Sequence, residues 1–182
     1  MRRLVILISV VVSLTIISSA TAQGLGFNGV GAKAGLIMPE DPWDTGFFVS
    51  ITADLGEITE NLSLVPFVGY WKSNYSIYEY DLGLSNIQLG ADVHYFLSGV
   101  PGLYAGGGLS LNLLSVEYPT FNYLGGGITT DSESETKLGF GFLAGYGFNV
   151  AGQNIFVEGK YNIISDFNTL ELAVGIMFDL KK

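Results

Sequence analysis

The sequence contains no cysteine and only one histidine, His94. Without cysteine, the chain is neither a scaffold held by disulfides nor a lipoprotein, whose lipid is attached to that residue. Basic residues are also scarce, with eight Lys and Arg against 17 Asp and Glu and a formal net charge of −9. A nucleic-acid partner is therefore not expected, because binding to phosphates requires a basic surface.

Long apolar runs are missing after residue 22, so residues 23–182 offer no helix of the ~18 apolar residues that a membrane span requires. The one extended apolar run, residues 4–17, follows a short basic segment and precedes the small residues of 20–22. It is shorter than a spanning helix, so this order predicts a secretory signal peptide over residues 1–22, with cleavage before Gln23. Residues 23–182 then form a single domain without arginine.

Glycine and aromatic residues are abundant, with 25 Gly, ten Tyr and 12 Phe. The clearest pattern is the stretch 86–97, NIQLGADVHYFL, in which alternate residues are apolar while those between are mostly polar. A period of two is typical of a strand with one face in each environment. The stretch is also long enough to cross a bilayer as a tilted strand, which takes about 9–11 residues.

The same alternation recurs along the chain. In the third stretch the two faces differ less, and Leu64, Pro66, Val68 and Tyr70 are expected to face outward. Short turns alternate with longer connections, expected at residues 39–45, 73–83 and 115–135, as in outer-membrane barrels. The expected strands are residues 27–38, 46–55, 62–72, 86–97, 103–114, 136–150, 155–163 and 169–180.

These features predict an all-β fold, an eight-stranded antiparallel up-and-down transmembrane β-barrel. In hydrocarbon every backbone polar group must be paired, which only helices and closed barrels achieve. The apolar faces would contact lipid, with aromatic girdles that include Phe47, Tyr70, Tyr95, Phe148 and Tyr161. A soluble barrel with the opposite facing is the alternative. The less apolar faces, expected to line the lumen as a polar network, carry Lys33, Asp54, Asp92, His94, Lys137, Glu158, Lys160 and Glu171.

Three segments carry a resemblance to a known family: GVGAKAGL near the start, KLGFGFLAGYGF in the sixth strand and FVEGKYNI in the seventh. With the hairpin series they resemble the outer-membrane β-barrel superfamily of OmpA/OmpX and OmpW type over residues 23–182. The resemblance implies a monomeric protein of the Gram-negative outer membrane. It implies contacts with outer-membrane lipids and with the barrel assembly machinery, and no cofactor.

The function expected is a structural or surface-interaction role in the cell envelope. The alternative is a narrow, porin-like channel or binding barrel for small hydrophobic molecules. A lipid-modifying enzyme would use His94 beside Asp92, but no serine adjoins His94 in sequence, so we expect no enzymatic activity. Acidic residues of the outer connections form either a solvated surface or sites for divalent cations that bridge to lipid head groups; they are Glu40, Asp41, Asp44, Glu79, Asp81, Glu117, Asp131, Glu133, Glu135 and Asp166.

Overall fold

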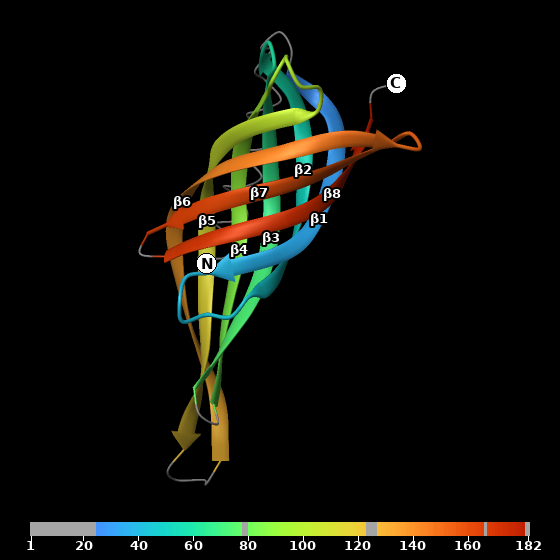
Figure 1. Ribbon diagram of the computed structural model, residues 1–182. Coiled ribbons are helices and arrows are strands. Elements are labelled where there is room, and N and C mark those ends of the chain that lie inside the picture. Colours follow the sequence, from blue (N-terminus) through green and yellow to red (C-terminus); the bar gives the residue numbers. More distant parts are fainter. Residues whose placement is uncertain (1–24, 78–79, 123–126, 166, 181–182) are drawn as a thin grey trace.

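The computed structural model describes residues 25–77, 80–122, 127–165 and 167–180 (Figure 1). The predicted signal peptide lies outside the described residues. No helix in the described part of the chain is long and apolar enough to span a membrane. The described residues form eight strands: β1 (Leu25–Pro39), β2 (Gly46–Thr59), β3 (Leu62–Ile77), β4 (Tyr80–Phe96), β5 (Leu103–Asn122), β6 (Gly127–Val150), β7 (Gln153–Ile164) and β8 (Phe167–Asp179).

Each strand pairs antiparallel with the next along the chain, and the sheet closes on itself. The closing ladder joins β1 to β8 from Gly29 opposite Asp179 to Pro39 opposite Thr169. The predicted eight-stranded up-and-down barrel is therefore confirmed, and the membrane-embedded strands have no unpaired edge at this seam.

The apolar faces point outward, as predicted. Leu109 and Leu138 are 70% and 68% exposed, whereas Gln88 and Asp92 are 4% and 2% exposed. The third strand also has the predicted facing, because Val68 on its outer face is 53% exposed. The girdle aromatics Phe47, Tyr70, Tyr95, Phe148 and Tyr161 are all exposed on the outer surface.

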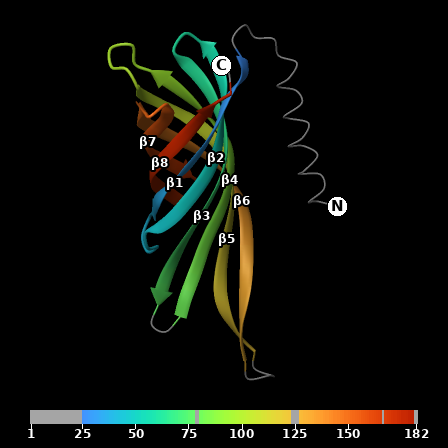
Figure 2. The ribbon, with the colours of Figure 1, turned by 90° about the vertical axis from the view of Figure 1, so that its right-hand side faces the viewer.

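Two expected loops are in fact strands. Within 73–83, β3 continues to Ile77 and β4 begins at Tyr80, and within 115–135, β5 continues to Asn122 and β6 begins at Gly127. The two pairs of strands project from one end of the barrel as long hairpins (Figures 1 and 2). Cross-strand ladders hold both hairpins extended, and the Thr and Tyr residues of these segments favour strands.

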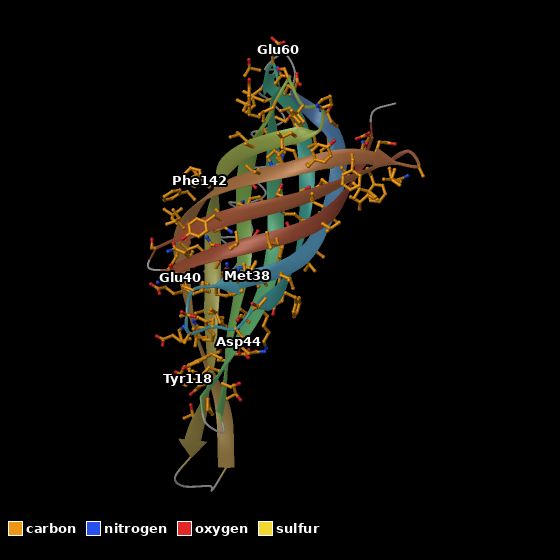
Figure 3. The ribbon with its side chains drawn as sticks, viewed as in Figure 1. Met38, Glu40, Asp44, Glu60, Tyr118 and Phe142 are labelled. Carbon is orange, nitrogen blue, oxygen red and sulfur yellow. The ribbon has the colours of Figure 1, made fainter. Side chains whose placement is uncertain are left out.

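The two ends of the barrel differ. The turn end carries the tight connections at residues 60–61, 97–102 and 151–152. Asn61 and Gly152 there have positive φ angles of 63° and 84°, which short reversals require. The hairpin end carries the projecting strands, and Figure 3 shows Glu60 at the turn end and Tyr118 on the β5–β6 hairpin.

Candidate functional site

Two buried ion pairs cross the middle of the lumen. Lys33 on β1 forms an ion pair with Glu158 on β7, and their side chains are only 5% and 3% exposed. Lys160, two residues further along β7, donates to both carboxylate oxygens of Asp92 at 2.7 and 2.8 Å. The ammonium of Lys160 also lies 4.1 Å from the centre of the Phe67 ring. Every charge of these two pairs is thus compensated, as burial in the barrel requires.

The same layer includes polar groups on other strands. The hydroxyl of Tyr104 on β5 donates to Glu158 Oε2 at 2.9 Å. His94 stacks on the Tyr104 ring with 4.7 Å between centroids, and its Nε2 lies 4.0 Å from the same carboxylate oxygen. Glu171 accepts a hydrogen bond from the Asn162 amide at 2.9 Å. The network therefore joins β1, β4, β5, β7 and β8 around one carboxylate-rich centre.

Inward-facing glycines leave the space that these side chains occupy. A Cβ atom at Gly145 would lie 2.3 Å from the Tyr104 hydroxyl, and one at Gly108 would lie 2.2 Å from Asp92 Oδ1. Both distances are far below any van der Waals contact, so a larger residue at either position would displace a member of the network. The abundance of glycine thus has a local reason in the packing of the lumen.

Six of the eight predicted lumen residues meet in this layer: Lys33, Asp92, His94, Glu158, Lys160 and Glu171. The other two do not join it. Asp54 lies at the turn end and accepts the backbone N–H of Gly56 at 2.8 Å. Lys137 lies at the hairpin end and pairs with Glu135 at 3.3 Å. Both face the lumen side of their strands, but strand length carries them beyond the central layer.

Sequence reasoning missed three contributors to the network, Tyr104, Asn162 and Phe67. All three did lie on the predicted inner faces of their strands, and that alternation was the available signal. Their partners depend on which strands face one another across the lumen, and a single strand's pattern does not contain that information.

An apolar cluster fills the lumen between the ionic layer and the hairpin end, and we call it the plug. Its largest members, Trp71 and Phe48, are 0% and 2% exposed, and Trp71 stacks with Phe167 at a centroid distance of 6.2 Å. The plug shares this level of the barrel with Asn86, a buried side chain that is the cross-strand partner of both Trp71 and Leu114. It consists of Ile37, Phe48, Trp71, Leu84, Leu114, Ile164 and Ala173.

On the other side of the ionic layer, a cavity of about 340 Å³ opens towards the turn end. Lys33, Glu158 and His94 lie among the residues that line this turn-end cavity, and so do Asp54 and Asp179. Two buried polar atoms of its lining residues, Thr52 Oγ1 and His94 Nε2, have no hydrogen-bond partner. Buried polar atoms are nearly always paired, so these two mark a place where a bound molecule would find partners.

A second hollow, of about 690 Å³, lies at the hairpin end. Leu114, Val116 and Tyr118 of β5 form an apolar row in this hairpin-end groove, and Glu133 and Glu135 of β6 form an acidic row beside it. Val116 is the direct cross-strand partner of Glu133, so the two rows share one face of the hairpin.

The acidic residues form no obvious metal site. Within the described residues, no group of three or more His, Asp or Glu side chains is placed to hold a metal ion. Glu79 and Asp166, which were among the candidates, lie outside the described residues. Binding of divalent cations at the hairpin end stays a prediction.

Known structures share this fold. Neisserial surface protein A is 19% identical, with 84% of this chain and 96% of that protein covered and a TM-score of 0.55. Ail, the attachment invasion locus protein of Yersinia pestis, is 14% identical, with 85% and 99% covered and a TM-score of 0.55. Ail has also been solved in complex with the heparin analogue sucrose octasulfate, and that structure has a TM-score of 0.56.

No curated protein matches the sequence. A family model does match, the outer membrane protein beta-barrel domain, over residues 8–178. That match takes in all but the last residue of the eight-stranded barrel, whose exterior is apolar and whose lumen is charged. The chain therefore belongs to the outer membrane protein beta-barrel domain family and is a protein of the Gram-negative outer membrane.

Proposed function

We propose that this barrel is a cell-surface interaction protein, and that its β5–β6 hairpin binds an extended, basic polypeptide segment. In outer-membrane barrels short turns face the periplasm and long connections face outward. The hairpin end then lies outside the cell, where a protein partner has access to it.

The observation that carries this proposal is an open strand edge. The ladder between β6 and β7 ends at Gly139 opposite Ile164, whereas β6 continues to pair with β5 as far as Gly127. Among the described residues, no strand covers the other edge of β6 from residue 127 to residue 137. An exposed edge of this length offers a row of backbone donors and acceptors, to which an incoming strand adds by β-augmentation.

The side chains beside this edge favour a basic partner. Asp131 and Glu133 have no lysine within salt-bridge distance in the described part of the chain, while Glu135 is paired with Lys137. The adjacent apolar row of Val116 and Tyr118 would accept alternate apolar side chains of the added strand. Ail binds a polyanion analogue in one of its structures, but an acidic row of this kind would repel such a ligand.

The plug argues for an interaction role over the channel alternative. A lumen closed by Trp71, Phe48 and their neighbours offers ions no water-filled path at that level, and eight strands leave little interior space in any case. Neither Neisserial surface protein A nor Ail is named as an enzyme, and we expect no enzymatic activity here. Outer-membrane lipids, the barrel assembly machinery and a monomeric state remain our expectations for its surroundings.

Peptide binding to the barrel in lipid nanodiscs tests the proposal. The probe is a fluorescent 12-residue peptide of alternating Lys and Val, which presents basic side chains on one face of a strand and apolar ones on the other. We expect saturable binding that weakens as salt is raised, because the acidic row is exposed to solvent. The variant Asp131→Lys/Glu133→Lys should weaken the affinity by about tenfold or more, through loss of attraction and added repulsion.

The control is Glu57→Lys/Glu60→Lys, which makes the same charge change on exposed residues at the turn end, away from the groove. It should leave the affinity within about twofold. A peptide of alternating Glu and Val should not bind. Equal binding of the two peptides, or equal loss of affinity in Glu57→Lys/Glu60→Lys and the groove variant, would contradict the proposal.

A further inference from the structure

The turn-end cavity is not used by the proposed surface function, and its lining has a chemical character of its own. It faces the periplasm if the hairpins face outward. Its volume of about 340 Å³ lies at the small end of the range in which proteins bind organic molecules. The ionic layer and the plug close its inner end, so a molecule would enter and leave from the periplasmic side.

One wall of the cavity is acidic. Gly29 on β1 lies opposite Asp54 on β2 and opposite Asp179 on β8, so the two carboxylates flank a residue without a side chain in one row of the sheet. Asp54 accepts the N–H of Gly56, and Asp179 accepts the Asn154 amide at 2.7 Å. Neither carboxylate has a lysine within salt-bridge distance in the described residues, so both keep their charge uncompensated.

The facing wall is aromatic. Phe96 and Tyr104 line the cavity from β4 and β5, and these strands lie across the barrel from β8 and β1. Carboxylates on one side and ring faces on the other are the two environments that favour a positively charged organic group, through ion pairing and cation–π attraction.

A hydrogen-bond acceptor is also free at this wall. Thr52 lies two residues before Asp54 on the same face of β2, is 5% exposed, and its hydroxyl oxygen has no partner. An ammonium group carries three N–H donors, so it could engage this hydroxyl together with a carboxylate of the acidic wall. Lys33, the lysine that lines the cavity, is neutralised by its ion pair with Glu158 and does not oppose a cation.

We propose that the turn-end cavity binds a small organic cation from the periplasm, an ammonium group carried on an apolar or aromatic body. The ammonium lies against Asp54, Asp179 and Thr52, and the apolar body lies against the aromatic wall. An anion of the same shape would meet the uncompensated carboxylates and is disfavoured.

Calorimetric titration of the barrel in phosphatidylcholine nanodiscs tests this site with three matched probes. Benzylammonium, benzyl alcohol and phenylacetate share a ring and differ in charge. We expect saturable binding of benzylammonium with one site per barrel, affinity for benzyl alcohol lower by about tenfold or more, and no binding of phenylacetate. Empty nanodiscs correct for partitioning of the probes into lipid.

Two variants locate the binding. Asp54→Asn/Asp179→Asn removes both charges with little change of shape, and we expect benzylammonium affinity to fall by about tenfold or more. Thr52→Val removes only the hydroxyl and should weaken binding by a smaller factor, which provides a test if the double variant does not fold. The control Glu60→Gln removes a charge at the same end of the barrel, on a turn residue outside the cavity.

The proposal is overturned if phenylacetate binds as tightly as benzylammonium, or if the heat signal equals that of empty nanodiscs. It is also overturned if Glu60→Gln weakens binding as much as the cavity variants do, because the attraction would then be a property of the whole rim. Circular dichroism of each variant shows whether the β-barrel is retained, and only folded variants enter the comparison.

Discussion

Lys160 on β7 reaches across the lumen to Asp92 on β4, with its ammonium 2.7 Å from one carboxylate oxygen and 2.8 Å from the other. These strands are not neighbours in the sheet. The ion pair therefore links two walls of the barrel that no backbone ladder joins, and both side chains are more than nine-tenths buried.

Breaking this pair from one side should be costly. Lys160→Met leaves the Asp92 carboxylate buried without its partner, and we expect the free energy of unfolding to fall by about 3–5 kcal/mol. Urea unfolding in lipid vesicles, followed by tryptophan fluorescence, measures the change. The double variant Lys160→Met/Asp92→Asn should recover part of the loss, because no uncompensated charge remains. Equal stability of Lys160→Met and the wild type would show that the pair contributes nothing.

A charged residue introduced on the lipid-facing surface should destabilise the barrel, by an amount that depends on its depth in the membrane. Leu109 on β5 is 70% exposed and lies in the part of the strand that pairs within the barrel. Leu109→Lys should destabilise the barrel by about 2–4 kcal/mol in vesicles, because the ammonium would lie in hydrocarbon. Ser132→Lys, on the projecting part of β6, should change stability by less than about 0.5 kcal/mol. Similar losses in both variants would contradict the outward facing.

The plug should keep the barrel closed to ions. In planar bilayers we expect the wild-type protein to give no discrete openings, because Trp71 and Phe48 fill the lumen. The variant Phe48→Ala/Trp71→Ala removes the two largest plug side chains and should give a measurable ion leak. Unitary conductance from the wild type would restore the channel alternative, and a silent double variant would show that the ionic layer alone seals the lumen.

Loss of the histidine should leave outer-membrane lipids unchanged. Ser63 is the cross-strand partner of His94, yet no hydrogen bond joins these side chains in the described part of the structure. Because an activated nucleophile needs such a contact with its base, we expect no acyl transfer here. Mass spectrometry of lipids from cells that carry His94→Ala, against the wild type and Ser63→Ala, provides the measurement. Altered acylation in both variants would point to an enzyme.

Alternation of apolar and polar residues was sufficient to predict the barrel and its facing, because a strand between lipid and lumen must alternate. The same rule does not distinguish a strand from a loop where both faces of the strand contact water. Residues 115–122 and 127–135 are rich in polar residues and glycine and were expected to be loop, yet they form a paired ladder from Leu114 opposite Glu135 to Asn122 opposite Gly127. In these segments the structure depends on backbone pairing, which the polarity of the side chains does not reveal.

The candidate sites were only partly foreseeable for a related reason. The lumen position of Lys33 and Glu158 follows from each strand's own pattern, but their partnership depends on which strands face each other after closure. Likewise, Asp54 and Asp179 lie 125 residues apart in the sequence and meet only because both pair with Gly29. Closure of the sheet creates such neighbours, and no local pattern specifies them.

The β1–β8 seam has a consequence for biogenesis. The strand that completes the cylinder, Phe167–Asp179, is synthesised after the other seven strands of the barrel. A chain that stops before it would expose the open edges of β1 and β7 to acyl chains, where unpaired peptide groups find no water. Truncated products should thus fail to insert as partial barrels and become substrates for periplasmic proteases, so that the envelope receives either the whole barrel or none.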